Sequence, residues 1–205
     1  MDASFWDGVA TRYVGRPISD TASYERTLAM TEAHLRPDMV GVELGCGSGM
    51  TARRLAPRMQ ALTAVDFSEG MIGHAQRLHA QESGPDNLDY QVATLDDLAG
   101  RTVDVVLAFN LIHLLPDRDA ALAQIHGLLR PDGLFISKTG CVGGAWQLLR
   151  AVIGPMQMLG KAPRDLRYFT PAQLERSVQA AGFEILETTT APKRPPARFI
   201  VARRR

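Results

Sequence analysis

Strand-sized apolar runs alternate with helical patterns through residues 39–139, and this alternation limits the possible folds more than any other feature. The apolar runs cover residues 39–44, 61–66, 88–93, 103–109 and 134–139. The helical patterns cover residues 51–58, 69–81 and 118–129. Strands that alternate with helices favour right-handed crossovers and a mostly parallel sheet. We therefore expect a doubly wound α/β fold.

The alternation stops after residue 139, and residues 141–168 form an apolar insertion. Thr170 and Pro171 are typical of the start of a helix, and Gly182 is typical of its end. Two last strands are expected at residues 183–190 and 198–203, where the short loop between them forces an antiparallel pair. The sequence thus predicts seven strands in a mostly parallel sheet, with the last strand antiparallel.

A chain of 205 residues suits one domain with a single core. We divide residues 1–205 into an N-terminal helical cap, a cofactor-binding core, a lid-like insertion and a C-terminal helix with a hairpin. Their ranges are 1–37, 38–139, 140–168 and 169–205. Within the first range, aromatic residues precede a helix expected at residues 25–35.

The composition gives no indication of a nucleic-acid or membrane partner, because the formal net charge is only +1. The most apolar window is too short and too interrupted to span a bilayer. The two cysteines lack the spacing of a disulfide framework or a metal site, and the N-terminal residues lack the pattern of a signal peptide. We expect a cytoplasmic protein without a metal site.

A glycine-rich loop follows the first expected strand. Gly45, Gly47 and Gly49 alternate with other residues, and Met50 stands where the dinucleotide fingerprint has its third glycine. Asp66 ends the second strand, at the place where an acceptor for ribose hydroxyls is expected. The loop therefore predicts a nucleoside ligand, whereas its seat for a pyrophosphate is incomplete.

Glu43 indicates the charge of that ligand. A dinucleotide would bring two phosphates close to this carboxylate, and like charges at ~5 Å cost about 3 kcal/mol at an effective dielectric constant of 20. A cofactor without phosphate and with a cationic end avoids this repulsion. S-adenosylmethionine, which carries a sulfonium and an ammonium group, fits these requirements.

Five segments occur in the order and spacing of a known family. They are Val42-Glu43-Leu44-Gly45-Cys46-Gly47-Ser48-Gly49 and residues 64–72, 110–116, 129–134 and 169–183. Together they resemble the motifs of class I S-adenosylmethionine-dependent methyltransferases. The similarity is greatest to the small-molecule branch that includes ubiquinone/menaquinone-type C-methyltransferases. Residues 5–13 resemble the N-terminal lead-in of that family.

The resemblance implies roles for individual residues around the cofactor. Gly45, Cys46 and Gly47 would pass under its methionine part, beside Glu43, and Tyr13 would reach the same end. An ordinary tight turn is the alternative for the three loop residues.

Asp66 would accept both ribose hydroxyls, with a helix-capping role as its alternative. Phe67 and Met71 would pack on the adenine, although apolar residues at these positions also suit the core. Asn110 follows the fourth strand at its carboxyl end, where open α/β sheets bind ligands.

The third strand departs from the family pattern. Many relatives end it with Gly-Asp-Ala, whereas this chain has Ala93-Thr94-Leu95. We expect the Thr94 hydroxyl to accept the adenine amino group and the Leu95 N–H to serve the adenine ring. Asp96 or Asp97 would take over if the loop shifts, and a helix-capping role for Thr94 is equally open.

His113 is the candidate catalytic base or substrate-orienting group, because imidazole titrates near neutrality. A structural histidine bonded to a loop carbonyl is the alternative. The reaction does not require a base, since displacement at an activated sulfonium depends mainly on proximity and alignment.

The expected acceptor pocket combines N-terminal aromatic residues with the apolar insertion. Its candidate residues are Trp6, Cys141, Trp146, Met156 and Tyr168. An insertion rich in methionine suits an adaptable apolar lid, while a homodimer interface or a membrane-surface helix are the alternatives.

We therefore expect methyl transfer to an O, N or C atom of a small, fairly apolar acceptor. A noncatalytic S-adenosylmethionine-binding regulator or scaffold and a nicotinamide-dependent oxidoreductase are the alternatives. A nucleic-acid methyltransferase is disfavoured, because Asn110-Leu111-Ile112-His113 replaces the usual Asn/Asp-Pro-Pro-Tyr/Phe segment.

Overall fold

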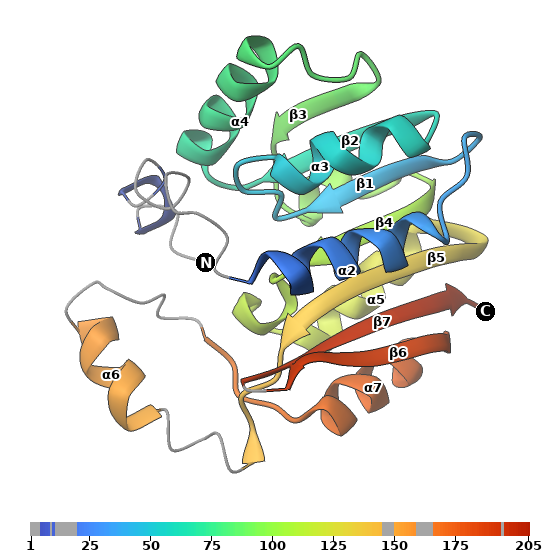
Figure 1. Cartoon of the computed structure of the whole chain (residues 1–205). Helices are drawn as coiled ribbons and strands as arrows, with labels where there is room; N and C mark the ends of the chain where they lie inside the picture. Colours follow the sequence, from blue (N-terminus) through green and yellow to red (C-terminus); the bar gives the residue numbers. More distant parts are fainter. Residues whose placement is uncertain (1–4, 9, 11–19, 145–149, 159–165, 194) are drawn as a thin grey trace.

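The computed structural model describes residues 5–8, 10, 20–144, 150–158, 166–193 and 195–205. Its centre is a seven-stranded sheet with the order β3-β2-β1-β4-β5-β7-β6 (Figure 1). The strands are β1 (Val40–Leu44), β2 (Ala61–Asp66), β3 (Leu88–Val92), β4 (Val103–Phe109), β5 (Leu129–Gly140), β6 (Phe183–Lys193) and β7 (Pro196–Arg204). Strand β7 is antiparallel to both of its neighbours, whereas β1 to β5 pair in parallel. The predicted fold class is confirmed.

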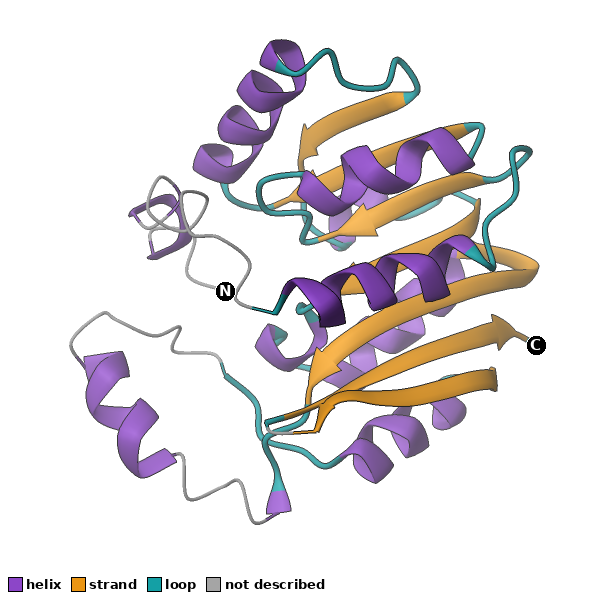
Figure 2. Cartoon of the chain, in the orientation of Figure 1, coloured by secondary structure: helices purple, strands orange, loops and turns teal. Residues whose placement is uncertain are grey.

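Helices cover both faces of this sheet (Figure 2). They are α2 (Thr21–Glu32), α3 (Met50–Leu55), α4 (Glu69–Gln81), α5 (Arg118–Leu128) and α7 (Pro171–Ala180). Helix α6 (Arg150–Met158) lies apart from the sheet. Short 3-10 turns are η1 (Ala56–Arg58), η2 (Asp96–Leu98) and η3 (Ile112–Leu114). None of the helices within the described ranges is long and apolar enough to cross a membrane.

The helix expected at residues 25–35 begins and ends earlier, as α2. Asp20 caps it, because its carboxylate accepts a hydrogen bond from the Ser23 N–H at 2.9 Å. The prediction missed this cap because it placed the start of the helix at Glu25. The earlier start brings Ser23 and Tyr24 onto the helix.

Two apolar layers enclose the sheet. Helices α2, α3 and α4 pack on one face through residues such as Leu28, Leu55 and Ile72, whereas α5 and α7 pack on the opposite face. Neighbouring residues of β4, Val106 and Leu107, belong to different layers and are fully buried. This two-sided burial explains why β4 is apolar at every position except Asp104.

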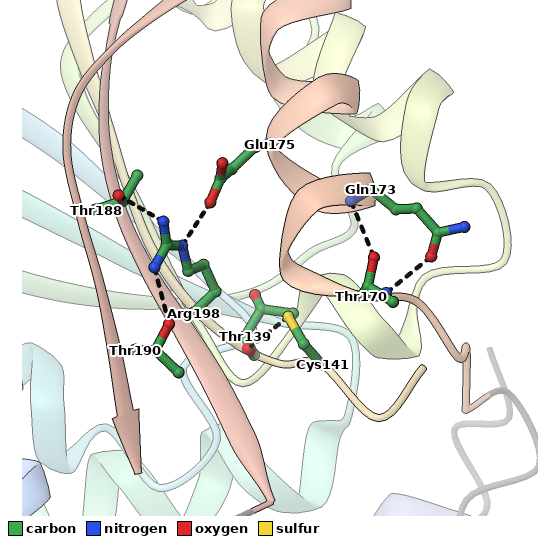
Figure 3. A network of polar contacts seen from close by, with 8 residues as sticks. All are labelled: Thr139, Cys141, Thr170, Gln173, Glu175, Thr188, Thr190 and Arg198. Carbon is green, nitrogen blue, oxygen red and sulfur yellow. Dashed lines mark hydrogen bonds and ion pairs between the residues drawn. The ribbon is translucent and has the colours of Figure 1, made fainter. Parts of the chain in front are cut away.

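A polar network connects α7 to the terminal hairpin (Figure 3). The Arg198 guanidinium on β7 donates to Glu175 on α7 at 2.6 Å. It also donates to the hydroxyls of Thr188 and Thr190 on β6, at 2.6 and 2.8 Å. The Thr170 capping box with Gln173 begins α7 as the sequence predicted. These contacts fix the edge of the sheet beside the carboxyl end of β5.

The buried Asp104 carboxylate connects β4 to β1 and to the start of β5. It accepts from the Val40 N–H at 2.7 Å and pairs with Arg130 at 2.7 Å. We expect Asp104→Ala to lower the free energy of unfolding by ~2 kcal/mol, because it leaves the Val40 N–H without its charged acceptor. Urea unfolding followed by circular dichroism measures this change.

Asp38→Ala is the matched control, because Asp38 forms an ion pair with Arg36 while both side chains are mainly exposed. Such pairs contribute little to stability. Equal unfolding free energies for Asp104→Ala and Asp38→Ala would contradict the proposed stabilising role of Asp104.

Candidate active site at the carboxyl ends of the strands

A cavity of about 610 Å³ opens beside the carboxyl ends of β1, β2, β4 and β5. This volume is within the usual range for small-molecule sites. Nine residues singled out from the sequence line it: Trp6, Glu43, Gly45, Cys46, Gly47, Asp66, Phe67, Met71 and Asn110. Segments that are far apart along the chain thus contribute to one site.

The glycine-rich loop forms part of the cavity wall. Gly45, Gly47 and Gly49 all have positive φ angles, of 64°, 54° and 70°. A Cβ atom added to Gly47 would meet no atom within 4 Å, so the space beside this residue belongs to the cavity. Glycine at this position therefore permits the turn and leaves room for a ligand to approach the backbone closely.

Asp66 connects this loop to the start of α4. One carboxylate oxygen accepts from the Gly47 N–H and the other from the Ser68 N–H, each at 3.0 Å. Burial raises the pKa of this carboxyl, and the two backbone hydrogen bonds oppose that rise. A carboxylate oxygen has two lone pairs, so both oxygens retain capacity for ribose hydroxyls.

Glu43 lies at the floor of the cavity and is only 2% exposed. Its Oε2 atom has no hydrogen-bond partner within the described part of the chain. Burial first, and the nearby Asp66 charge second, raise the pKa of Glu43 to about 8. An unpartnered buried acid is costly, and a cationic ligand would compensate it. The charge of this site therefore fits S-adenosylmethionine.

The N-terminal residues reach the same site. The Asp7 carboxylate accepts from the Ser68 hydroxyl and from the Gly70 N–H, which docks residues 5–8 at the start of α4. Trp6 lines the cavity together with Phe67 and Met71. Tyr13, expected at the methionine end of the cofactor, lies outside the described residues.

Thr94 and Leu95 do not line the cavity. The Thr94 backbone N–H and hydroxyl both donate to the Asp97 carboxylate, at 2.8 and 2.7 Å. These bonds lower the pKa of Asp97. The hydroxyl of Thr94 is therefore engaged within its own turn, and the adenine contacts proposed for Thr94 and Leu95 stay predictions without geometric support.

Asn110 and His113 differ in their relation to the cavity. Asn110 lines it with a positive φ of 55°, and its N–H donates to the Lys138 carbonyl at 2.7 Å. His113 lies behind the wall, close to Gly140. Burial lowers the pKa of His113 to about 4, so its imidazole is neutral at pH 7. Its role as a base stays a prediction, since a group with this pKa is a weak base.

Of the other residues expected in the acceptor pocket, those that the structure describes do not line the cavity. Cys141 is fully buried in the core layer of α5 and α7, where its thiol donates to the Thr139 carbonyl at 3.5 Å. Burial raises the pKa of that thiol to about 11. Met156 on α6 and Tyr168 are absent from the lining of the cavity as described. Trp146 lies outside the described residues, and the lid stays a prediction.

Sequence reasoning missed several cavity residues. Lys138 near the end of β5 and Ser23 and Thr27 on α2 all line the cavity. A charged residue near the end of the strand-like run 134–139 was the available signal for Lys138. The α2 residues had no such signal, because their position depends on how the helix packs against the sheet.

The fold and this site define a class I S-adenosylmethionine-dependent methyltransferase, and comparison with known proteins agrees. A family model described as a methyltransferase domain matches residues 42–135. The ubiquinone biosynthesis O-methyltransferase of Parvibaculum lavamentivorans is 31% identical over 210 residues, which cover 95% of this chain and 81% of that protein. The chain belongs to the class I S-adenosylmethionine-dependent methyltransferases.

Another relative is the ubiquinone biosynthesis O-methyltransferase of Aeromonas salmonicida, 35% identical over 149 residues that cover 69% of this chain. The chain spans 61% of the length of that protein. The structure of magnesium protoporphyrin IX methyltransferase from Synechocystis with bound S-adenosylhomocysteine is similar, with a TM-score of 0.71 and 18% identity. That similarity covers 93% of this chain and 89% of the Synechocystis chain. The two sequence relatives are named O-methyltransferases, and oxygen is one of the three attacking atoms that the sequence analysis left open.

Proposed function

We propose that this chain transfers a methyl group from S-adenosylmethionine to an O, N or C atom of a small, fairly apolar acceptor. The observation that supports this most directly is the unpartnered Glu43 carboxyl beside Asp66 on the floor of the cavity. A bound cation lowers the raised pKa of Glu43 and pairs with its carboxylate, whereas a pyrophosphate would be repelled by Asp66 and would raise that pKa further. This arrangement disfavours the nicotinamide-dependent alternative.

In this proposal the cofactor brings an activated methyl group, and the chain binds and orients both reactants. Asp66 holds the ribose, while Glu43 faces the cationic methionine end. Phe67 and Met71 pack on the adenine from the start of α4. The acceptor's attacking atom forms a new bond to the methyl carbon while the bond between that carbon and sulfur breaks. The electron pair of the broken bond stays on sulfur. Alignment is therefore the main requirement.

The remaining cavity wall suits an acceptor with apolar surface. Phe109, Leu111 and Leu114 lie on the β4 side, and Pro196 and Ala197 begin β7. Oxygen is the first attacking atom to test, because the named relatives of this chain are O-methyltransferases. The lid at residues 140–168 and the base His113 remain part of the proposal.

Two measurements test the proposed function. Calorimetry with S-adenosylhomocysteine is expected to show one binding site per chain, and absence of binding at millimolar ligand would refute the proposal. Turnover is then measured as S-adenosylhomocysteine release from S-adenosylmethionine with a panel of phenols, quinols and amines. Cofactor binding without turnover on any of them would favour the noncatalytic regulator or scaffold.

A further inference from the structure

Lys138 places a positive charge in the cavity wall, and the proposed cofactor site does not use it. Its ammonium donates to the Ser23 and Thr27 hydroxyls at 2.9 and 2.8 Å, and lies 3.4 Å from the Ser23 carbonyl. All three partners are neutral. Within the described ranges, no carboxylate forms an ion pair with Lys138, and Asp20 acts on it only through its more distant charge.

One N–H of this ammonium is poorly satisfied. The Ser23 carbonyl, its third partner, already accepts a hydrogen bond of 2.7 Å from the Thr27 hydroxyl. An ammonium group has three donors, and a contact of 3.4 Å is at the outer limit of hydrogen bonding. Lys138 therefore has a donor, as well as an unneutralised charge, available to a ligand.

The sheet places this charge away from the two acids but on the same face. Glu43 on β1 pairs with Leu107 on β4, and Leu107 pairs with Ile136 on β5. Lys138 follows Ile136 by two residues, and side chains two residues apart on a strand face the same side, so Lys138 and Glu43 lie on the same face of the sheet. Lys138 is on the second strand from β1, roughly 10 Å away at the usual strand spacing. The cavity wall thus has two acids at β1 and β2 and an ammonium at β5, with the Asp20 carboxylate before α2 also in the wall.

The size of the charge indicates the kind of anion. Among the described residues that line the cavity, Lys138 is the only lysine or arginine. A single ammonium matches a singly charged carboxylate better than a phosphate, because the acids in the wall (Asp20, Glu43 and Asp66) repel a more highly charged anion more strongly. Phenols are mostly neutral at pH 7, whereas carboxylic acids are ionised.

We propose that the Lys138 ammonium binds a carboxylate carried by the methyl acceptor, so that the site selects small organic acids with an apolar body. This inference rests on the proposed methyl transfer, whose acceptor it narrows. Two hydrogen bonds to α2 hold the ammonium in place, and the apolar residues Leu114 and Pro196 provide the neighbouring wall.

Matched pairs of acids and amides test this inference by binding alone. Protein saturated with S-adenosylhomocysteine is titrated with benzoate, 4-hydroxybenzoate, 3,4-dihydroxybenzoate and 2-naphthoate, each beside its neutral amide. We expect at least one acid to bind about tenfold or more tightly than its amide. In Lys138→Met this preference is lost while the affinity of the amide is unchanged, and Lys138→Arg retains part of it. No preference in any pair, or a preference that persists in Lys138→Met, would overturn the inference.

Two further controls separate the possible causes. Arg36→Met removes an exposed positive charge, so it keeps the preference for the acid if that preference arises at Lys138. The methionine carboxylate of the cofactor is the other possible source of the anion. If Lys138→Met weakens S-adenosylhomocysteine about tenfold but leaves 5′-methylthioadenosine unchanged, Lys138 binds the cofactor and the inference is wrong.

The outcomes also separate this inference from the proposed function. A normal preference for acids without turnover on any acceptor would contradict methyl transfer only. Turnover on neutral acceptors, without any preference for acids in binding, would contradict the role of Lys138 only.

Discussion

Asp66→Ala is expected to weaken S-adenosylhomocysteine binding by about a hundredfold, or ~2.7 kcal/mol. Two losses contribute. The substitution removes the charged acceptor proposed for the ribose hydroxyls. It also removes the acceptor for the Gly47 and Ser68 N–H groups, which position the glycine-rich loop relative to α4. Isothermal titration calorimetry of the purified variant measures the change.

Asp66→Asn separates the two contributions. An amide retains the size of the side chain and one accepting oxygen, but its NH₂ group faces a backbone donor. We therefore expect an intermediate loss of affinity. Asp89→Ala, an exposed acid on the neighbouring strand β3, is the matched control and should bind normally. Unchanged affinity in Asp66→Ala would remove this residue from the cofactor site.

Glu43→Gln is expected to weaken S-adenosylhomocysteine binding about thirtyfold, or ~2 kcal/mol, because it removes the charged partner of the ammonium group of this ligand. The loss should depend on pH. Burial and Asp66 raise the pKa of Glu43 to about 8 in the free site, and a bound cation lowers it again. Binding to the wild-type protein therefore releases a proton at pH 6–7.5, and affinity rises with pH in that range.

Calorimetry in buffers of different ionisation enthalpy measures this proton release. The comparison with Glu43→Gln removes the contribution of the ligand's own amino group, which is present in both titrations. Equal proton release by the two proteins would show that Glu43 does not change its protonation when the cofactor binds.

The stability of the free protein provides an independent check of Glu43. Its pKa in the folded chain, about 8, is above its ordinary value of 4.5. The folded state then binds more protons than the unfolded state between these values, so the contribution of Glu43 to stability falls as pH rises through this window. At pH 9 and without ligand, Glu43→Gln should therefore unfold at higher urea concentration than wild type. A variant that is both more stable and weaker in binding would identify Glu43 as a destabilised functional group.

Much of the fold followed from local pattern. The apolar runs predicted the seven strands, and the short final loop predicted the antiparallel β7. The position of Gly41 inside β1 had no local explanation. In the structure a Cβ at this position would lie 2.9 Å from the Val105 side chain on β4, so the glycine leaves room for that side chain.

The candidate site was predictable where a short segment contains both a turn at the end of a strand and the groups that would contact the ligand. Residues 42–49 and Asp66 are of this kind, because backbone geometry places their atoms near the strand ends. The acceptor side was not predictable in this way. Lys138 and Gly140 line the cavity, while Thr139 and Cys141 between and after them are buried. Successive side chains of a strand alternate between its faces. Cys141 follows Gly140 by one residue, so its side chain faces the core and not the cavity.

The sequence by itself determined the order of the strands along the chain, the glycine-rich loop and the acids that suit a cationic cofactor. These features depend on residues close together in the chain or on motifs with fixed spacing. Only the tertiary structure decided which side chains of α2, β5 and β7 complete the cavity. It also decided that His113 is half-buried with a lowered pKa. Both outcomes depend on contacts between distant segments, and burial among those segments controls the charge of each group.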